Sequence, residues 1–576
     1  MNFRKMPKIL VRLRNITAIS YITVTLNLFC IALGITYIVK PLYSLIWDIF
    51  GFILVLTIFE NLLFIYFTLY KKNILRVKTH YYSYGFLLFI IIAIPCMMLG
   101  NLLLSVTYSN NIIDTIGAYL LLYIGYFGIF VFGFGFAVYE LKLLSNIELI
   151  LFKFSLFTTN RLNPKRLMRI SKKILILLSR ITFIIGIIFA VVIMVGSFEI
   201  VTTFIAIVSG QFGTFFSIIF LANTLLLLKL KKRKRTTKKY YKTAIIGLFV
   251  SGCLLMPLLF TNTTVKNAEN TFSIAFGNDW RTQIPSETHN YFSQSPFSLT
   301  GYFLGSRPKT SIIETNTLFY NDEGIRLYFD AYKPLNGGDG LPGENSVIIR
   351  IHGGSWVSGD KGMMNMMQMN KYFAAQGYVV FDIQYGLDRN PLFALDPLTP
   401  EYQKGNFDID DMMRHIGAFT QYLVTHAEEY GANLDSVFVS GGSAGGHLAS
   451  AVALAIASGN YTDIFGTGLT IKGLIPFYPA NGQMFFFGVA GSDKFKNPEK
   501  LITENSPPCL IFQGTHDILN YFSISERIRD LYVAKGNTHC AILWMPFGGH
   551  ASDFYFTGYY NQIFLYYMER FMYLYH

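Results

Sequence analysis

Seven long apolar stretches in the first 262 residues limit what this chain can fold into. Each has the length of a membrane-spanning helix and carries very little charge. The spans that we predict are residues 17–39, 49–69, 84–106, 115–138, 174–197, 201–228 and 243–262. Lipid offers no partner to backbone polar groups, so stretches of this kind cross a bilayer as helices. Residues 1–262 are therefore predicted to form a transmembrane helical domain.

Charge is divided unequally between the two halves of the chain. Residues 1–262 carry 28 Lys and Arg against 6 Asp and Glu, whereas residues 263–576 carry 20 against 29. The positive charge lies in short loops between apolar stretches, where it indicates membrane topology and contact with anionic lipid headgroups. The overall net charge of +13 is thus no sign of nucleic-acid binding, and we expect none.

Basic loops alternate with nearly neutral ones along the apolar half. Clusters of Lys and Arg precede the first span and follow the second, fourth and sixth. Under the positive-inside rule, these loops face the cytoplasm, and seven spans then place the carboxyl-terminal domain outside the cell membrane. The segment 143–158 is interrupted by Glu148 and Lys153, and we interpret it as an interfacial helix. If it spanned the membrane, the carboxyl-terminal domain would be cytoplasmic.

Glu60 places a carboxyl group in the middle of the second span. A charge at that depth is costly, and two interpretations stand side by side. One is a proton relay or ligand site, and the other is a protonated Glu60 that is hydrogen-bonded inside the bundle.

The five cysteines form no CxxC pair and no metal-ligand spacing. Cys509 and Cys540 begin two predicted neighbouring strands, so a disulfide between them is geometrically possible.

After the last span the pattern changes twice. Residues 263–310 are polar and turn-rich, and we predict a juxtamembrane connector there. In residues 311–576 strands alternate with helices, which is typical of a doubly wound, mostly parallel sheet. The predicted strands are Leu318–Tyr320, Arg326–Tyr332, Ser346–Ile351, Val379–Ile383, Ser436–Ser440, Gly473–Phe477, Cys509–Gln513 and Cys540–Pro546, with helices at 411–429 and 445–457.

A G-x-S-x-G motif at residues 441–445 lies between an apolar strand and a predicted helix. This tight turn needs a small residue two positions either side of the serine, because the two backbones approach closely and the hydroxyl is left exposed. Gly441 and Gly445 meet that need. The motif predicts Ser443 as a catalytic nucleophile.

A serine hydroxyl is a weak nucleophile at neutral pH, so a base and an orienting acid are expected later in the chain. Asp517 and His550 each follow a predicted strand, in the order Ser, Asp, His. They therefore lie at the edge where open α/β sheets place their active sites. We predict that His550 takes the proton from Ser443 and that Asp517 orients His550. His516 is expected to be a solvated loop residue.

A second glycine motif, His-Gly-Gly-Ser-Trp at residues 352–356, directly follows a predicted buried strand. The backbone N–H groups of Gly353 and Gly354, with that of Ala444, are predicted to form an oxyanion hole. His352 is expected to stabilise this loop by hydrogen bonding.

Together these motifs resemble the acetyl-esterase/lipase branch of the α/β-hydrolases, which includes hormone-sensitive-lipase-like and feruloyl-esterase-like enzymes. The resemblance rests on HGGSWVSGDK (352–361), GYVVFDIQYGL (377–387), EEYGANLDSVFVSGGSAGGHLA (428–449) and GTHD (514–517). It covers about residues 315–576 and implies carboxylic-ester hydrolysis through an acyl-enzyme without a cofactor. The chain departs from the family at Gln384–Leu387, where members commonly have Asp-Tyr-Arg-Leu and use the acid and the arginine to brace the active-site loops.

The sequence thus predicts a membrane-anchored serine esterase or lipase, with deacetylation of cell-envelope or exogenous acylated substrates as one form of the activity. A membrane acyltransferase would use the same triad and pass the acyl group to an acceptor other than water. A transporter or receptor with an accessory hydrolase domain is the remaining alternative, because a simple anchor needs only one span. We expect a small-molecule, lipid or glycan ester as substrate, with no cofactor and no metal.

The topology can be tested on intact cells or right-side-out spheroplasts. Added protease should digest the carboxyl-terminal domain or cut within 263–310, and a membrane-impermeant thiol reagent should not reach a cysteine introduced at Thr236. If the domain is protected while position 236 stays cytoplasmic, the seventh segment does not cross. If the domain is protected and position 236 is labelled from outside, the segment 143–158 spans.

Overall fold

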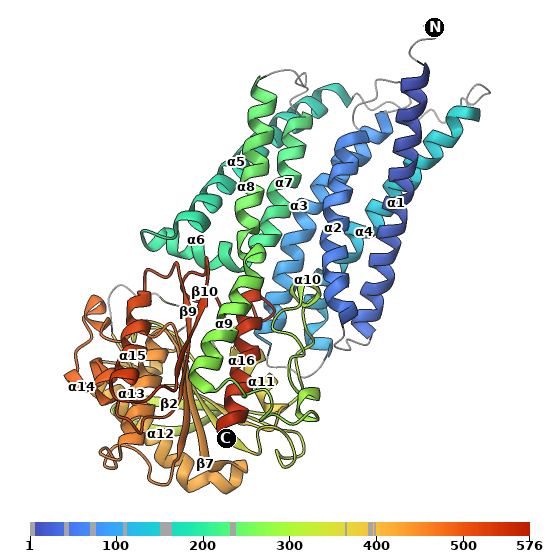
Figure 1. Cartoon of the computed structure of the whole chain (residues 1–576). Helices are drawn as coiled ribbons and strands as arrows, with labels where there is room; N and C mark the ends of the chain where they lie inside the picture. The colour runs from blue at the N-terminus through green and yellow to red at the C-terminus, as the bar shows by residue number, and fades with distance from the viewer. Residues whose placement is uncertain are drawn as a thin grey trace.

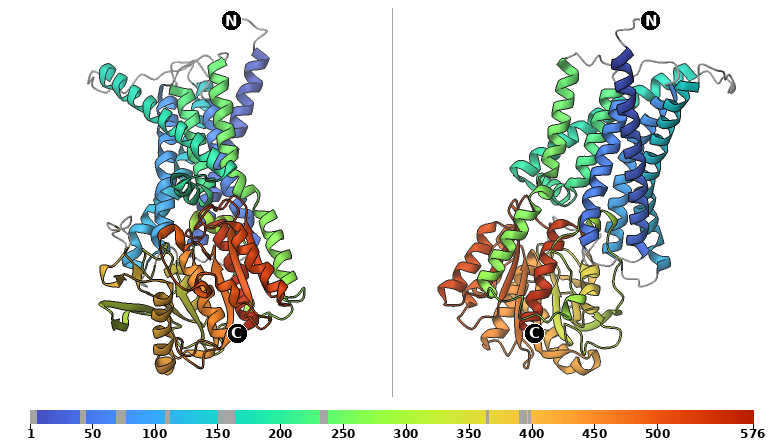
Figure 2. Two further views of the ribbon diagram at one scale, coloured as in Figure 1. Left: turned by 90° about the vertical axis from the view of Figure 1, so that its left-hand side faces the viewer. Right: turned by 45° about the vertical axis from the view of Figure 1, so that its right-hand side comes forward.

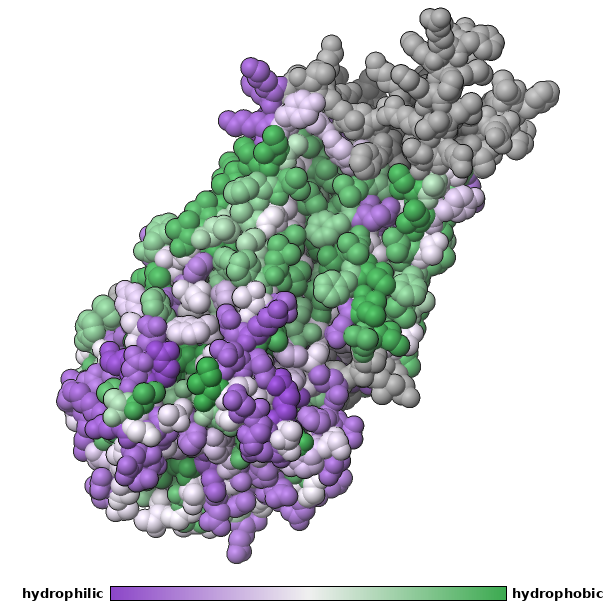
Figure 3. Space-filling view, viewed as in Figure 1, coloured by the Kyte–Doolittle hydropathy of each residue, from purple (hydrophilic) through white to green (hydrophobic). Residues whose placement is uncertain are grey.

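Long helices fill the first half of the chain, and an α/β domain follows them (Figure 1). The computed structural model describes residues 6–39, 45–68, 77–107, 112–149, 164–230, 238–362, 366–389, 396 and 399–576. The first helices are α1 (Met6–Val39), α2 (Leu45–Thr68), α3 (Val77–Ser105), α4 (Ile112–Leu149), α5 (Pro164–Val195), α6 (Ile200–Gln211), α7 (Gly213–Leu230), α8 (Lys238–Leu259) and α9 (Thr261–Phe276). Within these described residues, seven helical stretches are long and apolar enough to span a membrane. Figure 3 shows their apolar surface above a mostly polar second half, as predicted.

The predicted span 201–228 is two helices in the structure. α6 ends at Gln211, and α7 begins at Gly213. Figure 1 shows α6 lying across the end of the bundle that faces the α/β domain. The physical reason lies in its composition, because α6 buries polar side chains such as Thr202 and Gln211 against protein, and a continuous span would turn some of them to lipid. Of these two helices, only α7 is both apolar enough and long enough to span a membrane.

The helix that contains the last predicted span is longer than predicted. α8 continues into α9, so that one helical stretch runs from Lys238 to Phe276. The beginning of the segment 263–310 is therefore helical, and its remainder contains turns and helix α10 (Leu299–Leu304). Of the segment 143–158, residues 143–149 belong to the end of α4, and the other residues lie outside the described ones.

An eight-stranded sheet organises the second half, in the order β1-β2-β4-β3-β7-β8-β9-β10. All neighbours pair in parallel except β1 with β2 and β2 with β4. The sheet strands are β1 (Ile312–Asp322), β2 (Ile325–Lys333), β3 (Ser346–Ile351), β4 (Val379–Ile383), β7 (Asn433–Gly442), β8 (Ile471–Phe477), β9 (Cys509–Gly514) and β10 (Cys540–Met545), and a small separate sheet pairs β5 (Leu387–Asp388) with β6 (Lys404–Gly405). The helices are α11 (Met366–Ala374), α12 (Ile409–Tyr430), α13 (Ala444–Ser458), α14 (Asp493–Lys496), α15 (Phe522–Ala534) and α16 (Tyr559–Tyr575). The doubly wound, mostly parallel sheet is thus confirmed.

Both faces of the sheet are covered, so its central strands are buried throughout. Every residue of β3, β4 and β9 is buried, as expected where helices cover a parallel sheet on both sides. One apolar core continues from the bundle through α10 and α16 to the sheet. The two halves therefore pack as one body, and α1 begins at the end of the bundle that lies away from the α/β domain (Figures 1 and 2).

Glu60 lies in a polar cluster between α1 and α2. The Thr23 hydroxyl donates a hydrogen bond of 2.6 Å to its carboxyl group, and Asn27 and Asn61 bond to each other nearby at 2.9 Å. The other carboxyl oxygen, Oε2, is buried without a hydrogen-bond partner among the described residues, so the two interpretations of Glu60 both stay predictions.

Cys509 and Cys540 are direct partners in the β9–β10 register. Both are free thiols in the structure, so the disulfide that was geometrically possible is not formed.

Candidate active site

Ser443 occupies the sharp turn between β7 and α13. Its backbone lies at φ 58° and ψ −121°, a strained conformation for a residue with a side chain. A Cβ on Gly441 would come within 2.4 Å of the Gly445 carbonyl oxygen, and one on Gly445 within 2.2 Å of the Ile351 carbonyl oxygen. Only glycine fits at either position, and the turn presents the serine hydroxyl at the carboxyl edge of the sheet.

The structure brings Ser443, His550 and Asp517 into one hydrogen-bonded chain. His550 Nε2 lies 3.1 Å from Ser443 Oγ, and His550 Nδ1 lies 2.9 Å from Asp517 Oδ2. With Nδ1 protonated toward the carboxylate, Nε2 is free to accept the serine proton. The three residues come from loops after three different strands, as the sequence predicts.

Asp517 is fixed by its own loop. Its Oδ1 accepts hydrogen bonds of 2.9 Å from the backbone N–H groups of Leu519 and Asn520. Both carboxylate oxygens are thus occupied, and the side chain is fully buried. The Asn520 side chain reaches back over the site, with Nδ2 3.5 Å from Ser443 Oγ, and also donates to the Tyr478 carbonyl.

A second buried pair lies behind His550. The ring of Tyr478 packs on the imidazole with 4.7 Å between centroids, and its hydroxyl donates a 2.7 Å hydrogen bond to Asp553. Burial raises the pKa of Asp553, although the hydrogen bond from Tyr478 and the charge of Arg350 work against this. The sequence analysis did not identify this pair, because neither residue belongs to a recognisable motif.

The loop after β3 packs directly against Ser443. A Cβ on Gly353 would lie 2.7 Å from the Gly442 carbonyl oxygen and 3.4 Å from Ser443 Cβ. Gly354 has φ 125°, which favours glycine, and its carbonyl accepts from Val357 and Ser358 in a tight turn. The Gly353 backbone thus lies next to Ser443, and the oxyanion hole of Gly353, Gly354 and Ala444 stays a prediction.

Neighbouring side chains hold that loop in place. Trp356 Nε1 donates to His447 Nδ1 at 3.1 Å, and His447 Nε2 lies 2.7 Å from the Phe495 carbonyl. Burial lowers the pKa of His447 to about 4, so this link persists at neutral pH. The His352 ring stacks on Tyr385 and bonds within its own loop, and burial lowers its pKa.

Gln384, where the chain departs from the family pattern, also braces this region. Its side chain accepts from the Tyr328 N–H at 2.8 Å and donates to Asp360 at 2.6 Å. A neutral amide therefore links β2 to the oxyanion loop at the place where relatives commonly use an acid.

The edge of the sheet that carries Ser443, Asp517 and His550 faces the helical bundle. Gln211, the last residue of α6, donates a 3.1 Å hydrogen bond to the Ala551 carbonyl and accepts one of 2.9 Å from the Tyr555 N–H. A Cβ on Gly549 would meet Ala206 of α6 at 3.0 Å. The loop that carries His550 is thus held by the bundle.

His516 is less exposed than predicted, because it is partly buried against the bundle. Ser197, before α6, donates to its carbonyl at 3.2 Å, and its ring packs against Phe547. Burial lowers the pKa of His516. The bundle covers this side of the loop, which is a contact between distant parts of the chain that local sequence does not reveal.

The arrangement provides a nucleophile, a base and oriented backbone donors, which are the groups needed for acyl transfer. Within the described residues, no group of three or more His, Cys, Asp or Glu side chains is placed to hold a metal ion.

Comparison with known proteins relates this part of the chain to esterases. Residues 329–479 match the family model BD-FAE. The chain is similar to arylacetamide deacetylase from Bos taurus, at 25% identity over 38% of this chain and 49% of that protein. It is also similar to a probable isoprenylcysteine alpha-carbonyl methylesterase from Arabidopsis thaliana, at 23% identity over 38% of this chain and 45% of that protein. The chain thus spans about half the length of these curated relatives.

Among solved structures, the apo form of Thermogutta terrifontis esterase 2 aligns with a TM-score of 0.35 and 22% identity, over 45% of this chain and 90% of that one.

Gln211→Leu should lower kcat for a soluble ester by about 10- to 100-fold with a smaller change in KM, because it frees the loop that positions His550. The matched control is Asn223→Leu, which removes a bundle hydrogen bond to Ser179 away from this loop. Steady-state kinetics on the purified full chain measure both. Equal losses in the two variants would mean that Gln211 matters only for bundle integrity.

Proposed function

We propose that this chain, whose carboxyl-terminal domain is an α/β-hydrolase of the esterase branch, is a membrane-bound serine esterase that hydrolyses carboxylic esters through an acyl-enzyme. The observation that carries the proposal is the hydrogen-bonded chain from Ser443 through His550 to Asp517. The relatives named as a deacetylase and as esterases support the same reaction class.

In the first half of the reaction, Ser443 Oγ attacks the ester carbonyl while His550 Nε2 takes the hydroxyl proton. Asp517 stabilises the imidazolium that forms. The amides of Gly353, Gly354 and Ala444 donate to the oxyanion of the tetrahedral intermediate. Collapse of the intermediate breaks the bond to the alcohol oxygen, and His550 returns the proton to the departing alcohol.

Water completes the cycle. His550 takes a proton from a water molecule, whose oxygen attacks the acyl carbonyl, and the second tetrahedral intermediate releases the carboxylic acid and restores Ser443. His550 acts as the base through Nε2 in both halves of the reaction, so an imidazole held in one orientation serves acylation and deacylation. The bonds to Asp517 and the packing on Tyr478 support this role.

We place the catalytic domain outside the cytoplasm. The alternating basic loops support this orientation, and so does the beginning of α1 at the end of the bundle away from the α/β domain. A catalytic edge that faces the bundle then lies at the outer surface of the membrane.

The substrate class that we propose is an acylated, membrane-associated ester, with acetyl as the leading acyl group. Beside the active-site loops, Phe198, Ile200 and Phe204 expose about two thirds of their surface. Exposed apolar side chains on a helix at the bilayer surface insert among lipids. The name of the deacetylase relative supports an acetyl group.

Ser443→Ala should abolish ester hydrolysis and labelling by a fluorophosphonate probe, because it removes only the nucleophile; the loss in kcat is expected to be on the order of 10⁶-fold. His550→Ala should be similarly inactive, whereas His516→Ala should retain most activity. Gel fluorescence and kinetics on the purified chain report both effects. Persistent labelling of Ser443→Ala would overturn the nucleophile assignment, and the reverse result for the two histidines would exchange their roles.

Phe204→Ser should lower kcat/KM for an acetyl ester of a long-chain alcohol in mixed micelles by about tenfold, and leave a water-soluble acetyl ester unchanged, because it removes an apolar contact with the lipid phase. Ile274→Ser, which changes an exposed residue on α9, serves as the control. Equal losses on both substrates would argue against access from the membrane. Product analysis in the same assay gives free acetate for an esterase and an acylated acceptor for an acyltransferase.

A further inference from the structure

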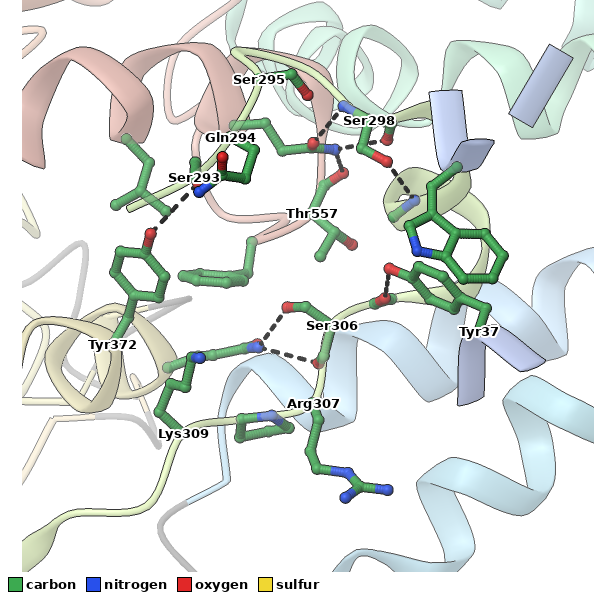
Figure 4. Close-up of a pocket in the computed structure, with 18 of the residues that line it drawn as sticks. Tyr37, Ser293, Gln294, Ser295, Ser298, Ser306, Arg307, Lys309, Tyr372 and Thr557 are labelled. Carbon is green, nitrogen blue, oxygen red and sulfur yellow. Dashed lines mark hydrogen bonds between the residues drawn. The ribbon is translucent and has the colours of Figure 1, made fainter. Parts of the chain in front are cut away.

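A cavity of about 610 Å³ lies between the bundle and the α/β domain, and no triad residue lines it (Figure 4). The ends of α1 and α2 form one side, the segment 293–310 crosses it, and α11 and α16 close it from the α/β domain. Its volume is in the range of sites that hold small molecules. The ester chemistry proposed for Ser443 gives this cavity no role.

One wall presents polar groups in fixed positions. Gln562 accepts from the Ser298 N–H at 2.8 Å and donates to the Ser298 and Thr557 carbonyls at 3.2 and 2.6 Å. The Ser293 hydroxyl lies 3.3 Å from that of Tyr372, and Ser295 is close by in Figure 4. Each hydroxyl keeps lone pairs for a further partner, so this wall suits a ligand that carries hydroxyl groups.

Trp47 brings an unused donor to the opposite wall. It lines the cavity and is only 8% exposed, and its indole N–H is buried without a hydrogen-bond partner in the described part of the chain. Tyr37 holds the indole by an edge contact at 5.3 Å between centroids, and donates to the Gly305 carbonyl at 3.1 Å. A buried donor without a partner calls for an acceptor from a ligand.

The mouth of the cavity carries positive charge. Arg307 and Lys309 line it and are exposed. Figure 4 shows Lys309 on the cavity side of the chain and Arg307 at its lower edge. Asp48 is the one acidic residue among the lining residues. The lining thus has two cationic side chains and one acidic one. Together with the indole N–H of Trp47, they favour a ligand with an anionic group such as phosphate.

Apolar surface continues from this mouth along the bundle. Val39 at the end of α1, and Leu45 and Ile46 at the start of α2, expose 75%, 74% and 59% of their surface. Closer to the middle of the bilayer, Ile35 of α1 and Ile49 and Phe52 of α2 expose 51%, 52% and 65% of their surface and face acyl chains. Tyr37 and Trp47 lie nearer the helix ends, at the depth where aromatic residues meet headgroups. A lipid with an anionic, hydroxyl-bearing headgroup and acyl chains matches both the polar cavity and the apolar surface of α1 and α2.

We propose that this cavity is a binding site for the headgroup of an anionic phospholipid, with phosphate at Arg307 and Lys309, headgroup hydroxyls on the serine-rich wall, and acyl chains against α1 and α2. The site is separate from the catalytic one, so it does not depend on the proposed esterase activity.

Native mass spectrometry of the detergent-purified full chain tests the proposal with dioleoylphosphatidylglycerol as the probe. The wild type should retain one lipid, and the double variant Arg307→Gln/Lys309→Gln should bind it at least about tenfold more weakly, as expected for the loss of two charge-assisted contacts. Ser295→Trp, which fills the cavity, should also prevent retention. The matched control Lys266→Gln/Lys535→Gln removes the same charge from exposed positions outside the cavity and should bind like the wild type.

Two further probes identify the part of the lipid that is recognised. Dioleoylglycerol, which lacks phosphate, should not be retained, and inorganic phosphate alone should not displace the bound lipid at millimolar concentration. A single symmetric size-exclusion peak and a thermal unfolding midpoint close to that of the wild type show that each variant is folded. Equal lipid binding by the wild type and both cavity variants would overturn the proposal, and so would displacement by inorganic phosphate, which would make the ligand a soluble anion.

Discussion

The loop that carries His550 is held between two parts of the chain, and the geometry of the catalytic edge depends on that contact. Gln211 accepts a hydrogen bond from the Tyr555 N–H and donates one to the Ala551 carbonyl. Its side chain is fully buried, so these bonds do not compete with water, and losing them would leave buried backbone groups without partners. A primary amide suits this position because it offers a donor and an acceptor at once.

Aromatic packing extends this contact into a common core. Tyr302 stacks on Phe215 of α7 at 4.8 Å and on Tyr559 of α16 at 5.1 Å between centroids, and Phe212 packs on Tyr555 at 4.7 Å. Stacked rings bury large areas and fix relative orientation. The boundary between the membrane part and the α/β part is therefore packed like the interior of a domain, and the two parts are expected to unfold cooperatively.

The hydrogen-bonded arrangement of Ser443, His550 and Asp517 could be predicted from sequence because its signals are local. The turn at Ser443 needs glycine on both sides within a few residues, and Asp517 and His550 follow strands with clear patterns. The spans could be predicted for the same reason, since length and apolarity are local properties.

The features that sequence did not predict are contacts between distant residues. Tyr478 and Asp553 meet only because two strand ends converge behind His550. At the break between α6 and α7, the polar side chain of Gln211 bonds to Ala551 and Tyr555 of the α/β domain. A mean hydropathy over 201–228 does not show such a contact. His516 looks solvated beside Asp517 until the bundle covers it.

The helical stretch from Lys238 to Phe276 connects the bundle to the α/β domain. A helix rises 1.5 Å per residue, so the 16 residues of α9 extend about 24 Å beyond the seventh span. Tyr567 of α16 donates to Glu269 on this extension at 3.0 Å, and Phe272 packs on the same tyrosine ring at 5.2 Å between centroids. Because α9 packs on α16, this helix fixes the distance of the α/β domain from the bilayer and its rotation about the helix axis. Adding one residue to such a helix turns everything beyond it by about 100°, so the length of α9 determines which side of the α/β domain faces the bundle.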